Sequence, residues 1–177
     1  KLKELHQRIE ATMVYVTHDQ TEALTCADQV IVMEEGEVVQ MGTPVELFER
    51  PRHTFVGHFI GSPGMNILPC ELKGGVASFQ GHDVALEGDV TVTKGHAEIG
   101  VRPEFVSLSR RGIAATVRKV ADVGRRTVIE AMVADVPVNA IIEGDIPEVG
   151  SQVKLAFEPS KTRLYVDGWI ATEENGR

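Results

Sequence analysis

The residue types that could do chemistry gather around His18, which is followed by an acid and an amide, Asp19 and Gln20. The four residues 13–16 are apolar and predict a buried strand. Asp19 with Glu22 three residues later has the spacing of a capping box and predicts that a helix starts there. A histidine between such a strand and such a helix lies at the carboxyl end of the strand, where open α/β sheets bind ligands.

Spacing alone favours a plainer interpretation of His18, a solvent-exposed histidine at the entry of a helix. The wider motif changes this, because Thr12 to Asn66 resembles the ATP-binding subunit of ABC importers, in the branch that takes up sugars and glycerol phosphates. The resemblance is collinear and continues into the second half of the chain. It is carried by Tyr15-Val16-Thr17-His18-Asp19-Gln20, Glu22-Ala23, Ala27-Asp28, Gly42-Thr43-Pro44, Phe59-Ile60-Gly61-Ser62-Pro63, Met65-Asn66 and Val101-Arg102-Pro103-Glu104.

The resemblance implies a catalytic role for His18. In that family the matching residue is the switch histidine, which contacts the γ-phosphate of ATP. Such a donor can hydrogen-bond the negative charge that builds on phosphate oxygens during transfer. Gln20 and Glu22 are expected to be helix-start residues rather than ligands.

The resemblance also implies a setting. The parent protein would be an ATPase that uses ATP and Mg²⁺ and works as a homodimer. It would lie in the cytoplasm on the inner face of the cell membrane, bound to permease subunits that receive cargo from a cargo-binding protein. The β-rich half would be a regulatory domain that a regulatory protein could bind.

The sequence lacks most of the residues that bind nucleotide in that family. It has no Gly-Lys pair, so it contains no phosphate-binding loop. Val30–Glu35 imitates an acidic pair after an apolar strand, but it has no Asp and follows the histidine, so it is interpreted as a strand running into a turn. Leu108–Gly112, the nearest match to a Leu-Ser-Gly-Gly-Gln motif, has arginines in place of glycines. We therefore expect a C-terminal fragment that binds no ATP and no metal by itself and is inactive alone.

The first third of the chain has helical and hairpin patterns. Apolar spacing predicts the end of an amphipathic helix at 1–10 and helices at 20–27, 43–50 and 54–60. Residues 29–33 and 37–41 predict a hairpin. The helix predicted at 43–50 has a full capping signature in Thr43-Pro44-x-Glu46.

Gly61-Ser62-Pro63-Gly64 marks the clearest break in the chain. Short strand-like runs follow it, at 76–79, 84–86, 98–101, 106–108, 113–123, 127–133, 136–142, 152–157 and 163–166. This spacing predicts a small all-β barrel, which the resemblance identifies as an oligonucleotide/oligosaccharide-binding (OB)-like regulatory domain. The predicted fold is thus an α/β fragment, 1–61, that ends a nucleotide-binding domain, followed by a β-rich domain, 62–177, and is β-dominated overall.

Composition excludes some functions. A net charge of −8, with one Trp, two Tyr and six Phe among 177 residues, argues against a nucleic-acid partner. The two cysteines, Cys26 and Cys70, have no metal-binding spacing and are expected to be reduced thiols. No apolar run is long enough to cross a membrane.

Positive charge nevertheless concentrates in the stretch from Arg102 to Arg126. We interpret this stretch as a solvated, salt-bridged face, with a site for an anionic regulator or an acidic partner as the alternative. The alternative to a function as part of an ATPase is accordingly a non-enzymatic β module that binds a small anion or a protein. Trp169 is expected to pack at the barrel end.

Two expectations concern packing surfaces. Residues 1–60 are expected to pack against the β domain or a second copy, because the strand at 13–16 would otherwise be bare. A homodimer interface is expected on the strands from Ile113 to Ile142, centred on Val117, Val120, Val128, Ile129 and Ile141.

Overall fold

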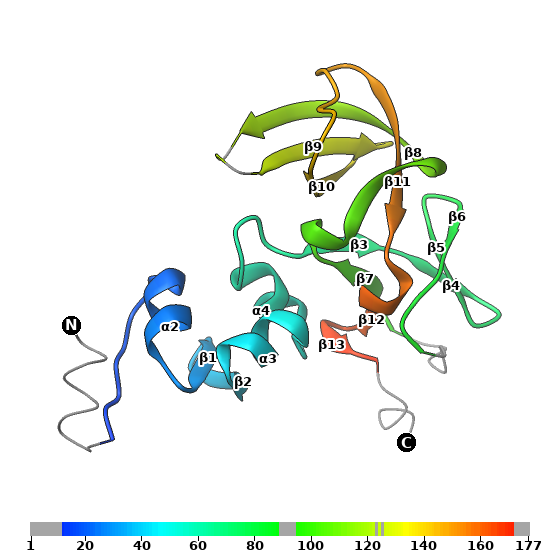
Figure 1. Cartoon of the computed structure of the whole chain (residues 1–177). Helices are drawn as coiled ribbons and strands as arrows, with labels where there is room; N and C mark the ends of the chain where they lie inside the picture. The colour runs from blue at the N-terminus through cyan, green and yellow to red at the C-terminus, as the bar shows by residue number, and fades with distance from the viewer. Residues whose placement is uncertain (1–11, 89–94, 123, 125, 172–177) are drawn as a thin grey trace.

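The computed structural model describes residues 12–88, 95–122, 124 and 126–171. The helix predicted at 1–10 lies outside these residues, and so does Arg125. Figure 1 shows the first elements of the chain, α2 to α4 with β1 and β2, on one side of the molecule and the remaining strands on the other.

The first part consists of three short helices and a hairpin. These are α2 (Gln20–Cys26), β1 (Val30–Glu34), β2 (Glu37–Gly42), α3 (Pro44–Glu49) and α4 (Thr54–Phe59). The two strands are antiparallel, and both residues of their turn have positive φ, Glu35 at 49° and Gly36 at 88°. The three helices and the hairpin predicted between residues 20 and 60 are therefore present, with ends that differ by one or two residues.

The helices cover one face of this hairpin. Val32 from β1 packs with Leu47 of α3, Val56 of α4 and Ile60 at the end of α4 in a small apolar core. The opposite face carries large apolar side chains that remain exposed: Ile31, Met33, Val38 and Met41. Directly paired residues share a face of an antiparallel pair, and Ile31 pairs with Met41 and Met33 with Val38.

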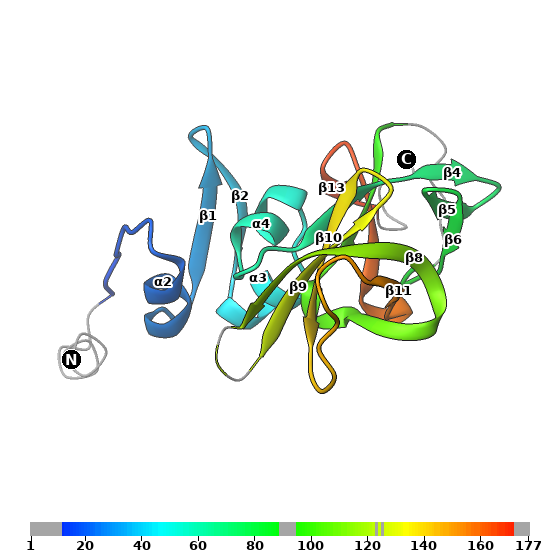
Figure 2. The same cartoon turned by 90° about the horizontal axis from the view of Figure 1, so that it is seen from above.

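The strand predicted at 13–16 is not formed. Its residues lie in an extended segment before α2 (Figure 2), where Val14 is 86% and Val16 90% exposed. A strand needs a neighbour for its backbone hydrogen bonds, and no described strand pairs with it. The sequence predicts that residues 1–60 pack against the β domain or a second copy. Helices α3 and α4 meet the β domain, residues 13–16 do not, and packing of residues 13–16 on a second copy stays a prediction.

The second part is built from two four-stranded sheets and one small sheet. The first sheet has the order β13 (Trp169–Ile170), β12 (Thr162–Val166), β7 (Ala97–Val101), β3 (Asn66–Pro69). The second has the order β10 (Val136–Ile142), β9 (Thr127–Val133), β8 (Val106–Asp122), β11 (Gln152–Phe157). The small sheet joins β4 (Glu71–Lys73), β5 (Val76–Phe79) and β6 (His82–Val84), and two 3₁₀ turns, Pro103–Phe105 and Pro159–Lys161, precede β8 and β12.

All three sheets contribute to one apolar core. Phe79 from β5, Ile99 from β7, Ile129 from β9 and Leu155 from β11 are fully buried in it. Every second residue of β9 points inward, as the alternation in its sequence predicts. The β-dominated, barrel-like fold predicted from the sequence is confirmed.

The core overturns part of the expected dimer interface. Val117 and Ile129 are 1% and 0% exposed because they point into the barrel, so they cannot form the centre of a contact with a second copy. Val120, Val128 and Ile141 are partly buried, and Val128 pairs with Ile141.

The runs predicted as separate strands at 106–108 and 113–123 form one bent strand, β8. Its pairing with β11 jumps from Ala114 to Leu108 between Lys154 and Leu155, so the residues between form a bulge. Gly112 sits in this bulge with φ 155°, and a Cβ there would lie 2.3 Å from the carbonyl oxygen of Leu155. The bulge lets one strand bend around the barrel.

The two parts meet at a row of carbonyl groups. Phe48, Glu49, Arg50 and Pro51 end helix α3 or follow it, and each of their carbonyl oxygens accepts a hydrogen bond from a side chain elsewhere in the chain. The donors are Arg102, Arg163, Gln40 and Tyr165, in the same order. The last carbonyls of a helix have no partner within the helix, so these donors complete it.

Arg102 is the most deeply buried of the charged donors, at 3% exposure. Its Nε donates to the Phe48 carbonyl at 2.5 Å and its Nη1 to the Ile60 carbonyl at 2.7 Å, while the guanidinium carbon lies 3.9 Å above the centre of the Phe48 ring. Burial lowers the pKa of Arg102 to about 10, and Nη2 has no hydrogen-bond partner within the described part of the chain. A cation suits the C-terminal ends of α3 and α4.

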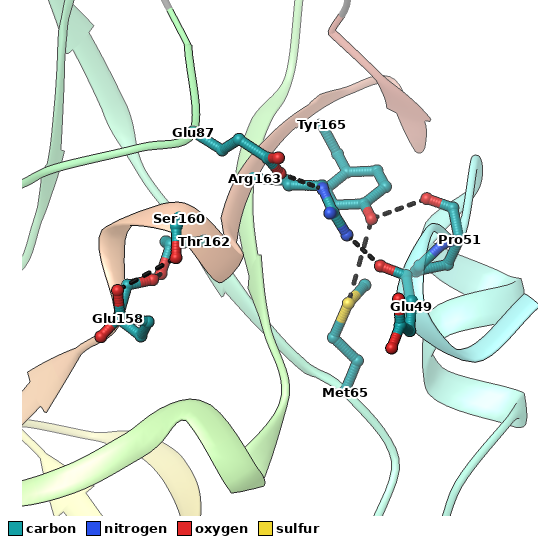
Figure 3. A network of polar contacts seen from close by, with 9 residues as sticks. All are labelled: Glu49, Pro51, Met65, Glu87, Glu158, Ser160, Thr162, Arg163 and Tyr165. Atoms are coloured by element: carbon teal, nitrogen blue, oxygen red, sulfur yellow. Dashed lines mark hydrogen bonds and ion pairs between the residues drawn. The ribbon is translucent and has the colours of Figure 1, made fainter. Parts of the chain in front are cut away.

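Tyr165 and Arg163 hold the same junction from strand β12 (Figure 3). The hydroxyl of Tyr165 donates to the Pro51 carbonyl at 2.9 Å, and burial raises the pKa of this tyrosine to about 12. Arg163 donates to the Glu49 carbonyl and pairs with Glu87 at 2.6 Å. Trp169 lies here too, edge-on to the His53 ring at 4.7 Å, so it packs against the start of α4 and not into the barrel end as expected.

Asn66 joins the two four-stranded sheets. Its side chain donates to the Asn139 carbonyl at 2.9 Å and accepts from the Asn139 amide at 2.8 Å, as a neighbouring strand would. It is 6% exposed, so both bonds lie away from water. The Met65-Asn66 and Val101-Arg102 motifs thus have structural roles in this fold.

The first prediction concerns Arg102. A hydrogen bond to a charged donor contributes about 1.5–3 kcal/mol, so Arg102→Met should lower the free energy of unfolding by about 3 kcal/mol. Urea denaturation followed by the fluorescence of Trp169, the single tryptophan, measures this. The matched control is Arg118→Met, because Arg118 pairs with Glu130 on the surface, and such pairs contribute about 0–1 kcal/mol. Equal losses in both variants would contradict the role given to Arg102.

Candidate functional site

His18 lies on an exposed turn between the extended segment 12–17 and helix α2. Asp19 is the N-cap of that helix, as predicted, and its Oδ1 accepts from the backbone amides of Thr21 at 2.8 Å and Glu22 at 3.1 Å. A short polar side chain at this position satisfies amides that the first turn leaves free. The backbone on the C-terminal side of His18 is therefore fixed to the helix.

Glu22 does not form the reciprocal half of the predicted capping box. Its Oε2 accepts instead from the hydroxyls of Tyr15 at 3.0 Å and Thr17 at 3.1 Å. The amide of Asp19, which a capping-box Glu22 would bind, donates to the Thr17 hydroxyl at 3.0 Å. The hydrogen bond to Glu22 also raises the pKa of Tyr15. Sequence reasoning thus placed Glu22 at the helix start but missed these two contacts.

The arrangement presents one imidazole to solvent on a turn that is fixed on both sides. An imidazole in this position can donate a hydrogen bond to an anionic oxygen. Within the described residues, no group of three or more His, Cys, Asp or Glu side chains could hold a metal ion.

The basic stretch from Arg102 to Arg126 does not form one face. Arg102, counted there as a surface charge, is buried, because its guanidinium reaches helix carbonyls. Arg118 and Lys119 both approach Glu130, at 2.6 Å and 3.7 Å. Within the described residues, Arg118 and Lys119 therefore fit the salt-bridged interpretation and Arg102 does not, and Arg125 lies outside these residues.

Two open hollows lie on the β domain. One, at the ends of β8, β9 and β10, is lined by Asp122, Gly124, Arg126, Thr127, Ile142, Glu143, Gly144 and Ile146. The other, beside the β8 bulge, is lined by Leu108, Ser109, Arg110, Ala114, Gln152, Val153 and Lys154. The first has charges of both signs, and the second has two cations, Arg110 and Lys154, both exposed. The predicted mimic of a Leu-Ser-Gly-Gly-Gln motif is thus part of the β8 bulge.

Comparison with known proteins shows what the chain resembles. Residues 99–164 match the model of the TOBE domain family. An uncharacterized ABC transporter ATP-binding protein of Sinorhizobium fredii is 41% identical over 167 residues, 91% of this chain and 44% of its own length. A putative ATP-binding protein of Brucella abortus is 38% identical over 169 residues, 93% of this chain and 48% of its own length.

The maltose/maltodextrin import ATP-binding protein MalK of Yersinia pestis is 31% identical over 179 residues, again 93% of this chain and 48% of its own length. These matches confirm the resemblance to ABC transporter ATP-binding subunits that the motifs from Thr12 to Glu104 predicted. The chain spans about half the length of the curated relatives it matches. None of the helices in the described residues is long and apolar enough to cross a membrane.

The second prediction separates the two cysteines. Cys26 is exposed, whereas burial raises the pKa of Cys70 to about 11. The thiolate is the nucleophile. Because a pKa about two units above the ordinary value lowers the thiolate fraction about 100-fold at pH 8, Cys70 loses about 99% of its reactive form. Iodoacetamide should therefore modify Cys26 at least about tenfold faster than Cys70.

Single-cysteine variants test this, with Cys70→Ser reporting Cys26 and Cys26→Ser reporting Cys70. In 8 M urea the two rates should converge, because the burial that protects Cys70 is lost. Equal rates in the folded chain would show that Cys70 is not protected.

Proposed function

We propose that this chain is the C-terminal portion of the ATP-hydrolysing subunit of an ABC importer for sugars or glycerol phosphates. It supplies the switch histidine, His18, and a regulatory β domain. The observation that carries the proposal is the exposed His18 on its fixed turn, within a chain whose relatives are named as ATP-binding proteins of transporters.

The chemistry assigned to His18 is hydrogen-bond donation. The imidazole donates to the γ-phosphate oxygens, where negative charge grows as the phosphoryl group transfers. A fixed turn suits this task, because a preorganised donor needs no rearrangement as the charge develops. ATP and Mg²⁺ are held by residues outside this sequence, since it has neither a phosphate-binding loop nor a described cluster of metal-binding side chains.

The exposed apolar surfaces of the first part support this assignment. The outer face of the β1–β2 hairpin and the segment 13–16 together expose Met13, Val14, Tyr15, Val16, Ile31, Met33, Val38 and Met41. On the hairpin the four side chains share one face, and an exposed apolar patch of this kind marks an interaction site. The rest of the nucleotide-binding domain covers it, and the division between domains falls at residues 61–62.

The β domain provides the regulatory contacts of the subunit. It meets a second copy through the outer face of β9 and β10, where Val128, Met132 and Ile141 are partly exposed. A two-fold contact through one patch suits a homodimer. The subunit as a whole binds permease subunits on the inner face of the membrane, a cargo-binding protein delivers the substrate, and a regulatory protein contacts the β domain.

The alternative, a β module that binds a small anion, is favoured by one observation, the hollow that contains Arg110 and Lys154. Both side chains are exposed, so the anion would bind through a screened surface interaction. Titration of the chain with inorganic phosphate decides between the two. Saturable binding that Arg110→Ala removes would favour the module.

The third prediction concerns the chain by itself. Without a phosphate-binding loop, the 177-residue chain should show no saturable heat with Mg-ATP in isothermal titration up to millimolar nucleotide. A dissociation constant in the micromolar range would contradict the proposal that nucleotide binds through residues outside this sequence.

The fourth prediction concerns His18 in the ATP-binding subunit that contains this chain. Loss of one preorganised donor to developing charge costs about 3–4 kcal/mol, so His18→Ala should slow ATP turnover about 10²–10³-fold. Affinity for ATP should change little. The control is His58→Ala, which removes another imidazole, because His58 lies on α4 and not on the His18 turn. Near-normal turnover of His18→Ala in the assembled transporter would refute the role of His18.

A further inference from the structure

The turn that carries His18 is tied together by one carboxylate oxygen. Oε2 of Glu22 accepts from the Thr17 hydroxyl at 3.1 Å and from the Tyr15 hydroxyl at 3.0 Å. The Thr17 hydroxyl oxygen in turn accepts from the amide of Asp19 at 3.0 Å. Thr17 and Asp19 are the two neighbours of His18 in the chain, so this bond spans the histidine. Glu22 anchors that bond to the helix.

The same chain offers an internal comparison. Glu46 follows Thr43 with the spacing by which Glu22 follows Asp19, and it forms a complete capping box. Its Oε2 accepts from the Thr43 amide at 2.8 Å and from the Thr43 hydroxyl at 2.9 Å. Glu46 therefore serves the start of its own helix, whereas the side chain of Glu22 turns away from the N-cap amide toward the segment before His18.

This diversion has a structural consequence. Helix α2 is capped by Asp19 without help from the Glu22 side chain. Among the described residues, the carboxylate of Glu22 instead accepts hydrogen bonds only from Tyr15 and Thr17, which precede His18 and lie in an extended, unpaired segment. A carboxylate oxygen has room for two such bonds.

We infer that Glu22 is a positioning residue for His18, which it orients through the Thr17 hydroxyl. The inference rests on the proposed function, because it assigns to Glu22 a part in the chemistry proposed for His18. Glu22 touches neither nucleotide nor reacting atoms in this role. It restricts the backbone on both sides of His18, so that the imidazole meets the phosphate in one orientation.

The test uses the ATP-binding subunit that contains this chain. Glu22→Ala should lower kcat about 10- to 100-fold, the loss that misplacement of a catalytic group produces, with KM for Mg-ATP unchanged. Glu22→Gln should retain most of kcat, because the amide oxygen can still accept from both hydroxyls. Glu46→Ala is the matched control, with the same residue at the same helix position and no link to His18, and it should keep full kcat.

A double-mutant cycle shows whether Glu22 acts through His18. In the His18→Ala background, Glu22→Ala should lower kcat no further, because the group that it positions is gone. Hydrogen exchange in the 177-residue chain gives a readout without nucleotide. The amide of Asp19 should exchange faster in Glu22→Ala than in wild type or Glu46→Ala.

The outcomes are distinct. If His18→Ala slows turnover and Glu22→Ala does not, the inference about Glu22 is wrong and the proposed function stands. If His18→Ala leaves turnover intact, the proposed function is wrong and the role of Glu22 is lost with it. Additive losses in the cycle, an equal loss in Glu46→Ala, or unchanged exchange at Asp19 would each overturn the positioning role.

Discussion

The structure depends on how four consecutive carbonyl groups at the end of helix α3 find hydrogen-bond donors. None of the donors belongs to the helix. One comes from the β1–β2 hairpin, and three come from the β domain, with Arg102 the most buried of the charged ones. An unpaired buried carbonyl is costly, so the helices and the barrel stabilise each other through these bonds. The Gly61–Gly64 break separates two regions of sequence composition, and buried hydrogen bonds of Arg102 and Tyr165 cross it.

The two sides of the molecule achieve order in different ways. At the junction, buried side chains from distant strands satisfy backbone groups, and the result is a fixed joint. At the His18 turn, all the partners lie within eight residues of one another, and all of them but the half-buried Thr17 are exposed. A turn held only by local bonds can keep its geometry while its surroundings change, and a donor that must meet a bound nucleotide benefits from this.

Local and periodic features could be predicted from the sequence. The alternation in Thr127–Val133 gave the correct inner face of β9, and Thr43 with Glu46 gave a complete capping box. Tertiary features could not. Nothing in the spacing around Arg102 indicates that its charge lies under two helix ends, although both of its neighbours, Val101 and Pro103, are apolar. The apolar run at 13–16 has the composition of a strand, but strand formation depends on a neighbour that composition does not reveal.

The sequence separation across the junction has a consequence for biosynthesis. The carbonyls of Glu49 and Pro51 are completed by Arg163 and Tyr165, both 114 residues later in the chain. At about 5–20 residues per second of translation, α3 therefore waits several seconds or longer after leaving the ribosome for its last partners. During that interval its end stays hydrated, and the adjoining apolar core can open. The barrel is thus the last part to form. A chain whose synthesis stops within β12 would therefore contain the helices without the hydrogen bonds that fix the end of α3.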